Sequence, residues 1–226
     1  MQRTQKTWQV TERTHDDLVE QLLANRDITD KEKFFSPDFE RDSHDPMLLP
    51  NMQGALDRIA KAMDAHETIC IYGDYDDDGI HGTALLLKVF AANGVTAIPY
   101  IPDREKEGYG LNQPAIEYLK TQGVTLLITV DLGITNKDQA AYAATLGIDV
   151  IITDHHHVEV ERLPTSAVAI VHPALPDSKY PFHGLAGGGV AWKLGQAIAA
   201  MTGKPDTAQL KWWFELPAIC TVCDVV

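Results

Sequence analysis

The chain contains 226 residues, and its 32 acidic side chains outnumber the 19 basic ones, so the formal net charge is −13. This length can bury a sizeable core without disulfides or a structural metal, and the shares of hydrophobic residues (45%) and charged residues (23%) are ordinary for a globular protein. The charge excludes a protein that coats nucleic acid through a broadly basic surface, and it argues against binding to an anionic membrane.

The first 50 residues predict a helical but irregular extension. Three leucines near residue 20 form a short apolar face, and residues 31–35 follow a helix-capping pattern. Segments that contain proline interrupt the helical pattern before residue 50. We therefore expect an N-terminal extension over residues 1–50 and a main domain over residues 51–226.

From residue 51 the pattern becomes a regular alternation of helices and strands. Asn51 is expected to cap a helix that carries Leu56, Ile59, Ala60 and Met63 on one stripe. Strands that are apolar almost throughout and alternate with helices indicate an α/β fold, in which helices cover both faces of a parallel sheet. The predicted strands are residues 68–72, 95–101, 125–130, 148–152 and 167–171, and the predicted helices are residues 83–92, 113–121 and 136–146.

Acidic and imidazole side chains follow three of these strands. Asp74 begins an aspartate-rich segment after the first strand, Asp131 follows the third, and Asp154 precedes a run of three histidines after the fourth. Ligands of parallel sheets bind beyond the carboxyl ends of the strands. Because unpaired carboxylates are costly to bury, a cation should hold these groups, and oxygen and imidazole ligands suit a pair of Mn²⁺ or Mg²⁺ ions.

Three aspartates alternate with other residues in the first of these segments. We expect Asp74, Asp76 and Asp78 to lie in an extended loop, where alternate side chains point the same way and the carboxylates converge. A solvated acidic loop is the alternative for this segment taken alone. A calcium-binding loop fits less well, because the downstream glutamate of such loops is missing. Because Asp131 and the three histidines follow other strands of the same predicted sheet, we favour a metal site.

Four motifs at these positions resemble the DHH phosphoesterase superfamily and, within it, the RecJ family of bacterial single-strand exonucleases. The motifs are IYGDYDDDG at 71–79, TVDLGIT at 129–135, TDHH at 153–156 and TVCD at 221–224. Further segments that resemble the RecJ family are NRDITD at 25–30, HDPMLLP at 44–50, YIPDR at 100–104, EGYGLN at 107–112, YPF at 180–182 and LAGGGVAWK at 185–193. The resemblance covers most of the chain in order, and it implies that residues 51–226 are a DHH catalytic domain.

The resemblance implies a centre of two divalent ions, with Mn²⁺ preferred or Mg²⁺. Asp131 would bridge the ions and act in catalysis with His156, which would also bind the scissile phosphate. Arg104 would be a further phosphate contact, and Asp154 is expected to orient an imidazole instead of binding metal. One ion would be held by Asp74, Asp76 and Asp131, and the other by Asp78, His155, Asp224 and the shared Asp131.

The implied activity is metal-dependent hydrolysis of phosphodiester bonds in single-stranded DNA, from 5′ to 3′, in cytoplasmic DNA repair and recombination. Replication or repair proteins would be candidate partners. One alternative is a DHH phosphodiesterase for short oligonucleotides or cyclic dinucleotides. A non-catalytic replication scaffold is less consistent, because such relatives lose metal ligands. Pyrophosphatase relatives normally have histidine where this chain has Asp74.

A few positions depart from the family pattern or allow two interpretations. Asp77 and His157 are unusual for the family and are expected to face solvent. The glycines at 187–189 precede a predicted helix, so their amides could face a phosphate, or the missing side chains could allow close packing. Tyr75 and Tyr109 could stack on bases, although Tyr109 could instead belong to a structural turn.

The cysteines and the C-terminal segment complete the sequence analysis. Three cysteines, two of them in a CxxC pair at Cys220 and Cys223, indicate a reducing, intracellular compartment and no disulfide framework. The chain ends in an apolar run directly after the fourth motif, without the second, DHHA1-type domain that the resemblance implies. We therefore expect a truncated chain that binds metal but hydrolyses long single strands weakly or not at all. Two bound divalent ions would add four charges and bring −13 to about −9.

Overall fold

The computed structural model describes residue 7 and residues 9–226. Its contacts divide the chain into two compact units, Met1–Ser43 and His44–Val226. The first unit contains the short helices α1 (Leu18–Ala24), α2 (Lys31–Phe35) and α3 (Phe39–Asp42). Each of these helices is capped by an aspartate that accepts a hydrogen bond from a first-turn amide, which satisfies a donor that the helix leaves unpaired. Leu23 is the one buried residue of α1.

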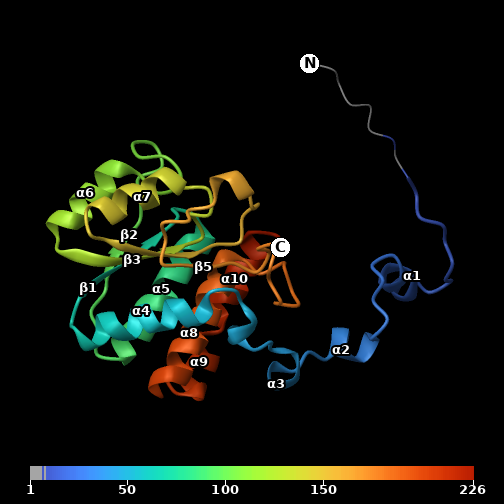
Figure 1. The fold of residues 1–226 in the computed structure, drawn as a ribbon. Helices are drawn as coiled ribbons and strands as arrows, with labels where there is room; N and C mark the ends of the chain where they lie inside the picture. Colours follow the sequence, from blue (N-terminus) through green and yellow to red (C-terminus); the bar gives the residue numbers. More distant parts are fainter. Residues whose placement is uncertain (1–6, 8) are drawn as a thin grey trace. The chain divides into compact units, whose positions relative to one another are not determined.

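A five-stranded parallel sheet forms the centre of the second unit (Figure 1). All four neighbouring pairs are parallel, and the strand order is β2-β1-β3-β4-β5. Strand β2 therefore lies on one side of β1, and β3, β4 and β5 follow in order on the other side. The strands are β1 (Thr68–Gly73), β2 (Ile98–Tyr100), β3 (Val124–Val130), β4 (Asp149–Thr153) and β5 (Ala169–Val171).

Helices cover both faces of this sheet, which confirms the predicted three-layer α/β fold. Figure 1 shows α6 (Gln113–Thr121) and α7 (Lys137–Thr145) on one face, with α4 (Met52–Asp64), α5 (Asp77–Ala92) and α8 (Gly187–Thr202) on the other. Further helical segments are η1 (Pro46–Leu48), η2 (Val160–Arg162), α9 (Thr207–Trp213) and α10 (Glu215–Cys223), of which α10 packs on α5 and α8. No helix in the described part of the chain is long and apolar enough to cross a membrane.

The central strands are apolar throughout because both of their faces are buried. Ile69 and Ile71 of β1 belong to the core beneath α4, α5 and α8, whereas Cys70 and Tyr72 belong to the core beneath α6 and α7. All four side chains are 0% exposed. Burying a large apolar side chain contributes roughly 1.5–3 kcal/mol, so the two cores fix the position of the strand ends.

Three local expectations differ from the structure. Helix α5 begins at Asp77 and not near residue 83, because the Asp76 side chain accepts a hydrogen bond from the Gly79 amide at 3.0 Å and caps the helix. The expected extended loop over 73–79 is therefore wrong beyond Asp76. The predicted strand at 95–101 is reduced to β2, which has three residues. Asn51 precedes α4, but its side chain makes no capping bond and instead donates to the Ile170 carbonyl at 3.1 Å.

Arg58 on α4 ties this helix to the amino ends of three strands. Its Nη2 donates to Glu67 Oε2 at 2.5 Å just before β1, and its Nε donates to Asp149 Oδ2 at 2.6 Å at the start of β4. Thr125 on β3 donates its hydroxyl to the same Glu67 oxygen at 2.6 Å. The hydrogen bond from Arg58 holds the pKa of Glu67 below its usual value. Charge-assisted bonds of this kind are stronger than neutral ones.

We predict that Arg58→Met lowers the free energy of unfolding at neutral pH by about 1–3 kcal/mol, because two charge-assisted hydrogen bonds are lost. Glu67 has a lowered pKa in the folded state, so its contribution is present above its unfolded pKa and is lost as the pH falls through the folded value. The difference between wild type and variant should therefore shrink below about pH 4. Urea unfolding at several pH values measures it. Gln53→Met, an exposed substitution on the same helix, is the control. An undiminished difference in acid would assign the effect of Arg58 to packing.

Candidate metal centre

The candidate site lies at the carboxyl ends of β1, β3 and β4, where the strand order reverses its direction. Ligands of doubly wound sheets bind at this position. The amide of each residue that follows a strand binds the carbonyl at the end of the neighbouring strand: Asp74 N to Val130 O at 3.2 Å, and Asp131 N to Thr153 O at 3.0 Å. The sheet thus continues for one residue beyond its strands and places Asp74 and Asp131 side by side.

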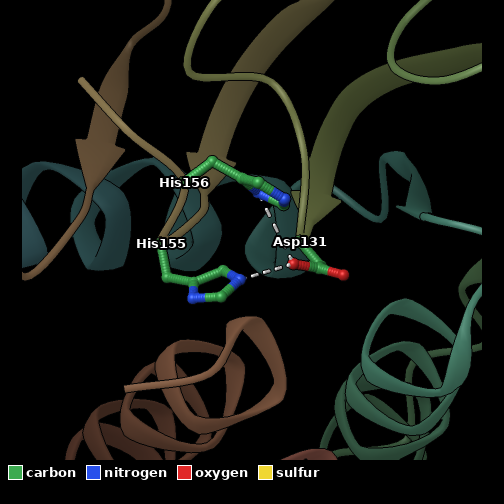
Figure 2. A group of neighbouring side chains, drawn as sticks. All are labelled: Asp131, His155 and His156. Carbon is green, nitrogen blue, oxygen red and sulfur yellow. Dashed lines mark ion pairs between the residues drawn. The ribbon is translucent and has the colours of Figure 1, made fainter. Parts of the chain in front are cut away.

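Carboxylate and imidazole groups from four segments meet at this edge. Asp131 and His155 are each shared between two groups, and Figure 2 shows His155 and His156 pointing toward Asp131. The structure brings together all six residues that the resemblance implies as metal ligands. Together with His156, these residues form three groups, and the ligand atoms of each group lie within 4.8 Å of one another. The groups are Asp74, Asp76 and Asp131; Asp78, His155 and Asp224; and Asp131, His155 and His156.

Several buried polar atoms at this site have no hydrogen-bond partner. Nε2 of His155 lies 3.2 Å from Asp131 Oδ1, 3.5 Å from Asp224 Oδ2 and 3.7 Å from Asp78 Oδ2. That nitrogen, Asp131 Oδ1 and Asp74 Oδ1 are buried and unpaired. Leaving a buried polar group unpaired costs about 1–3 kcal/mol, and more for a charged group. Divalent cations would satisfy these atoms, so the residues present fit a metal centre.

The electrostatics of the site also favour a cation. Burial raises the pKa of Asp131 from 3.8 to about 10, and the negative charges of Asp78 and Asp76 add to the effect. Burial likewise raises the pKa of Asp74 to about 6, with a further contribution from Asp76. Without a cation, Asp131 would hold a proton at neutral pH, which an aspartate in water lacks.

Asp78 is fixed by the start of α8. Its Oδ2 accepts a hydrogen bond from the Gly187 amide at 2.6 Å, and its Oδ1 accepts one from the Gly188 amide. These amides therefore face a carboxylate of the chain itself, which overturns the suggestion that they face a phosphate. The glycines also allow close packing, since a Cβ at Gly188 would lie 2.3 Å from Cys220 Sγ and one at Gly187 would lie 2.5 Å from the Asp131 Cβ.

Asp154 orients the imidazole of His156, as the sequence predicts. Oδ1 of Asp154 accepts a hydrogen bond from His156 Nδ1 at 2.8 Å, and its Oδ2 accepts one from the Ile134 amide at 2.8 Å. Asp154 is 0% exposed. The hydrogen bond to Asp154 raises the pKa of His156. Nδ1 of His156 thus carries a proton, and the opposite nitrogen, Nε2, lies 3.4 Å from the Tyr109 hydroxyl.

Two further residues hold the histidine segment and received no such role from the sequence. The Tyr109 hydroxyl lies 3.2 Å from His156 Nδ1 and donates to the Asp131 carbonyl at 3.3 Å. His172, which is fully buried, donates from Nε2 to the His156 carbonyl at 2.8 Å, while its Nδ1 accepts from the Ala174 amide at 3.0 Å. His172 directly follows β5, so its place at the end of a strand was the signal that could have found it.

The remaining candidate residues lie around the centre. Arg104 is exposed, and its guanidinium sits 5.1 Å from the centre of the Tyr75 ring. Its positive charge opposes the rise in the pKa of Asp74, which places it beside the carboxylates but outside the three groups. Asp77 and His157 both face solvent, as expected. Cys220 is buried and free against Gly188.

The chain is similar to known proteins in sequence and in fold. RecJ from Bacillus subtilis, a single-stranded-DNA-specific exonuclease, is 42% identical over 98% of this chain and 27% of its own length. A crystal structure of exonuclease RecJ bound to manganese matches with 35% identity and a TM-score of 0.67, over 78% of this chain and 44% of the other. RecJ from Thermus thermophilus in complex with Mn²⁺ matches with 30% identity and a TM-score of 0.69, over 90% of this chain and 28% of the other.

The chain thus spans little more than a quarter of the Bacillus subtilis relative. Residues 68–213 match the model of the DHH family, N-terminal domain. This segment runs from the first residue of β1 to the last residue of α9. It covers more than half of the chain, and the chain belongs to the DHH family.

Proposed function

We propose that this chain carries the catalytic centre of a metal-dependent phosphodiesterase that acts on single-stranded DNA. The observation that carries the proposal is the set of buried, unpaired ligand atoms on Asp74, Asp131 and His155, which face one another at the edge of the sheet. These atoms lie close to one another, with His155 Nε2 3.2 Å from Asp131 Oδ1, so a single cation could bind several of them. The relatives named as single-stranded-DNA-specific exonucleases support the choice of substrate.

The proposed ligands divide into two sets that share Asp131. Bound divalent ions, Mn²⁺ or Mg²⁺, would act as Lewis acids on the phosphate and lower the pKa of the attacking water. Two related structures hold Mn²⁺ and a third holds Mg²⁺. We assign Asp74, Asp76 and Asp131 to one ion, and Asp78, His155, Asp224 and the shared Asp131 to the other.

The chain's own residues would bind and orient the phosphodiester. Asp131, with its backbone in the left-handed region at φ 64°, contributes its carboxylate to two of the three groups, one with Asp74 and Asp76 and one with His155 and His156. His156 is held through Nδ1 by Asp154, so its other nitrogen can donate to an oxygen of the scissile phosphate when the ring is protonated. The hydrogen bond to Asp154 raises the pKa of His156, which extends the pH range over which the ring is protonated. Arg104 would be a second phosphate contact, through its forked donors.

The direction of digestion, the biological role, the location and the partners are part of the same proposal. Digestion from 5′ to 3′, a role in DNA repair and recombination, a cytoplasmic location and contacts with replication or repair proteins all follow from the resemblance to RecJ. Residues 1–50 would be an extension and residues 51–226 the catalytic domain. No proposed metal ligand is missing, and this supports an enzyme over a non-catalytic scaffold.

The direct test is hydrolysis of single-stranded DNA labelled at its 5′ end, a dinucleotide and pyrophosphate, each with Mn²⁺. We expect the wild type to cleave the dinucleotide, to cleave the long DNA strand weakly or not at all, and not to cleave pyrophosphate. Asp131→Asn should lose at least about a hundredfold in kcat for the dinucleotide. Asp138→Asn, an exposed aspartate in the first turn of α7, is the matched control and should retain activity. Full activity of Asp131→Asn would refute the shared role of this carboxylate.

We predict that Asp131→Asn stabilises the metal-free protein. The folded-state pKa of Asp131 is raised to about 10, so the stability that this group contributes is fully present below pH 4 and is lost as the pH rises through 10. An asparagine carries no charge and adopts the left-handed backbone readily. At pH 8 in EDTA, the Tm of the variant should exceed that of wild type by about 2–4 °C for each kcal/mol regained.

The same thermal unfolding measurements can separate charge from packing. The gain in Tm should shrink as the pH falls toward 4, where wild-type Asp131 is protonated in both the folded and unfolded states. Added Mn²⁺ should raise the Tm of wild type and not that of Asp131→Asn, because binding to the native state alone stabilises it. A variant that is less stable than wild type at pH 8 in EDTA would contradict the assignment.

We predict that Tyr109→Phe lowers kcat about 3- to 10-fold and changes KM less than twofold, because one hydroxyl no longer holds the Asp131 carbonyl and the His156 ring. The substrate is methyl p-nitrophenyl phosphate, a small diester, with Mn²⁺. Tyr142→Phe also removes a hydroxyl, one that donates to Glu117 at 2.7 Å between α7 and α6, and it should leave kcat unchanged. Equal losses in both variants would mean that the effect is one of general stability.

A further inference from the structure

A cleft of about 410 Å³ opens directly from the metal centre. Its lining consists of the consecutive histidines at 155–157 and of four apolar residues, Val158, Val160, Ala174 and Pro176. We call it the histidine cleft. Two of its histidines, His155 and His156, also belong to the candidate metal groups, so the inner end of the cleft is the place where a phosphate would be cleaved.

We propose that the histidine cleft binds the nucleotide that adjoins the scissile phosphate, with the phosphate beside the imidazoles and the sugar and base against the valines and the proline. This inference rests on the proposed function and adds a subsite to it. Neither the match to the family nor the metal groups assign a role to His157, Val160 or Pro176.

The charge around the metal centre supports this occupant. The chain has a formal charge of −13, and a DNA strand must reach the centre through a surface free of carboxylates. Among the described residues, none that lines the histidine cleft is acidic. Asp154 adjoins the cleft, but it is 0% exposed and its oxygens accept hydrogen bonds from the amides of Ile134 and His155 and from His156. The exposed ring of His157 can donate to a phosphate.

The size and the apolar side of the cleft fit a nucleoside. Its volume lies within the range of about 300–1,000 Å³ for small-molecule sites. Val160 is 61% exposed, and Pro176 is exposed beside it, so both present apolar surface to a ligand. Neither side chain offers a hydrogen bond to the edge of a base. The cleft should therefore accept any base, as a nuclease without sequence preference requires.

Hydrogen bonds hold both sides of the cleft in place. His172 binds the His156 carbonyl on one side and the Ala174 amide on the other, so it joins the segments after β4 and β5. In the helix η2, which contains the cleft residue Val160, the Glu161 carbonyl accepts a hydrogen bond from Lys137 of α7 at 3.2 Å. A site formed in advance in this way loses less conformational entropy when it binds a ligand.

The order of the strands places Arg104 and the histidine cleft on opposite sides of Asp131. Arg104 follows β2 at one side of the sheet, whereas the cleft follows β4 and β5 at the other, with Asp131 after β3 between them. A strand of DNA whose scissile phosphate lies over Asp131 could therefore extend toward Arg104 in one direction and into the histidine cleft in the other.

The test compares two substrates in the Mn²⁺-loaded protein, a thymidine dinucleotide and methyl p-nitrophenyl phosphate, which contains no nucleoside. Val160→Glu places a carboxylate in the cleft at an exposed position, so the fold should be retained. We expect it to raise the KM for the dinucleotide about tenfold or more through charge repulsion, and to affect the small diester at least fivefold less. Val168→Glu, a substitution at a valine that is 44% exposed outside the cleft, is the matched control and should change neither value.

A binding measurement makes the result independent of catalysis. Titration of the wild type with thymidine and adenosine deoxynucleoside 5′-monophosphates, followed by NMR, should shift the amide signals of His157 and Val160, with affinities for the two bases within about threefold. Absence of hydrolysis with these shifts present would refute the proposed function but not the cleft. Equal effects of Val160→Glu on both substrates, an equal effect of Val168→Glu, or absence of the shifts would overturn the proposal for the cleft.

Discussion

The candidate site depends on one constraint, which is the concentration of negative charge around the buried carboxylate of Asp131. The parallel sheet places the ends of β1, β3 and β4 together, and the residues after them are Asp74, Asp131 and Asp154. Asp154 is satisfied by hydrogen bonds, but Asp131 is not, and burial drives its pKa to about 10. A fold that retains such a group gives up stability locally, and that is typical of functional sites.

Two helix amino ends limit the effect of this charge without cancelling it. Asp76 caps α5 through the Gly79 amide, and Asp78 accepts hydrogen bonds from the first amides of α8. The partial positive charge of a helix end stabilises a carboxylate by about 0.3–1 kcal/mol. That is too little to offset several carboxylates at one edge, so these contacts orient the side chains while a divalent cation would supply the missing charge.

The sequence predicts the part of this site that follows from strand ends. Asp74, Asp131 and His155 come directly or almost directly after apolar runs, and the sheet brings such positions to one edge. Asp224 follows a helix, so no pattern in the chain places it, and only the resemblance to RecJ did so. The sequence did not predict the direction of the Asp78 side chain, because Asp76 caps a helix that begins inside the expected loop. The contacts of Tyr109 and His172 join distant segments, which periodicity does not report.

The net negative charge of the chain limits where DNA could bind, even when the candidate metal site is taken into account. If two divalent ions bind, the charge changes from −13 to about −9, so the surface as a whole still repels DNA. Attraction must then be local, and it must lie where carboxylates are absent or neutralised. Two places beside the metal groups fit this requirement best. One is the cationic Arg104 over Tyr75 after β2, which the exposed Asp103 and Glu105 flank in the chain, and the other is the histidine cleft after β4 and β5, whose lining holds no carboxylate. Under the proposed function, acidic surroundings with these two approaches would restrict how a strand of DNA enters the site.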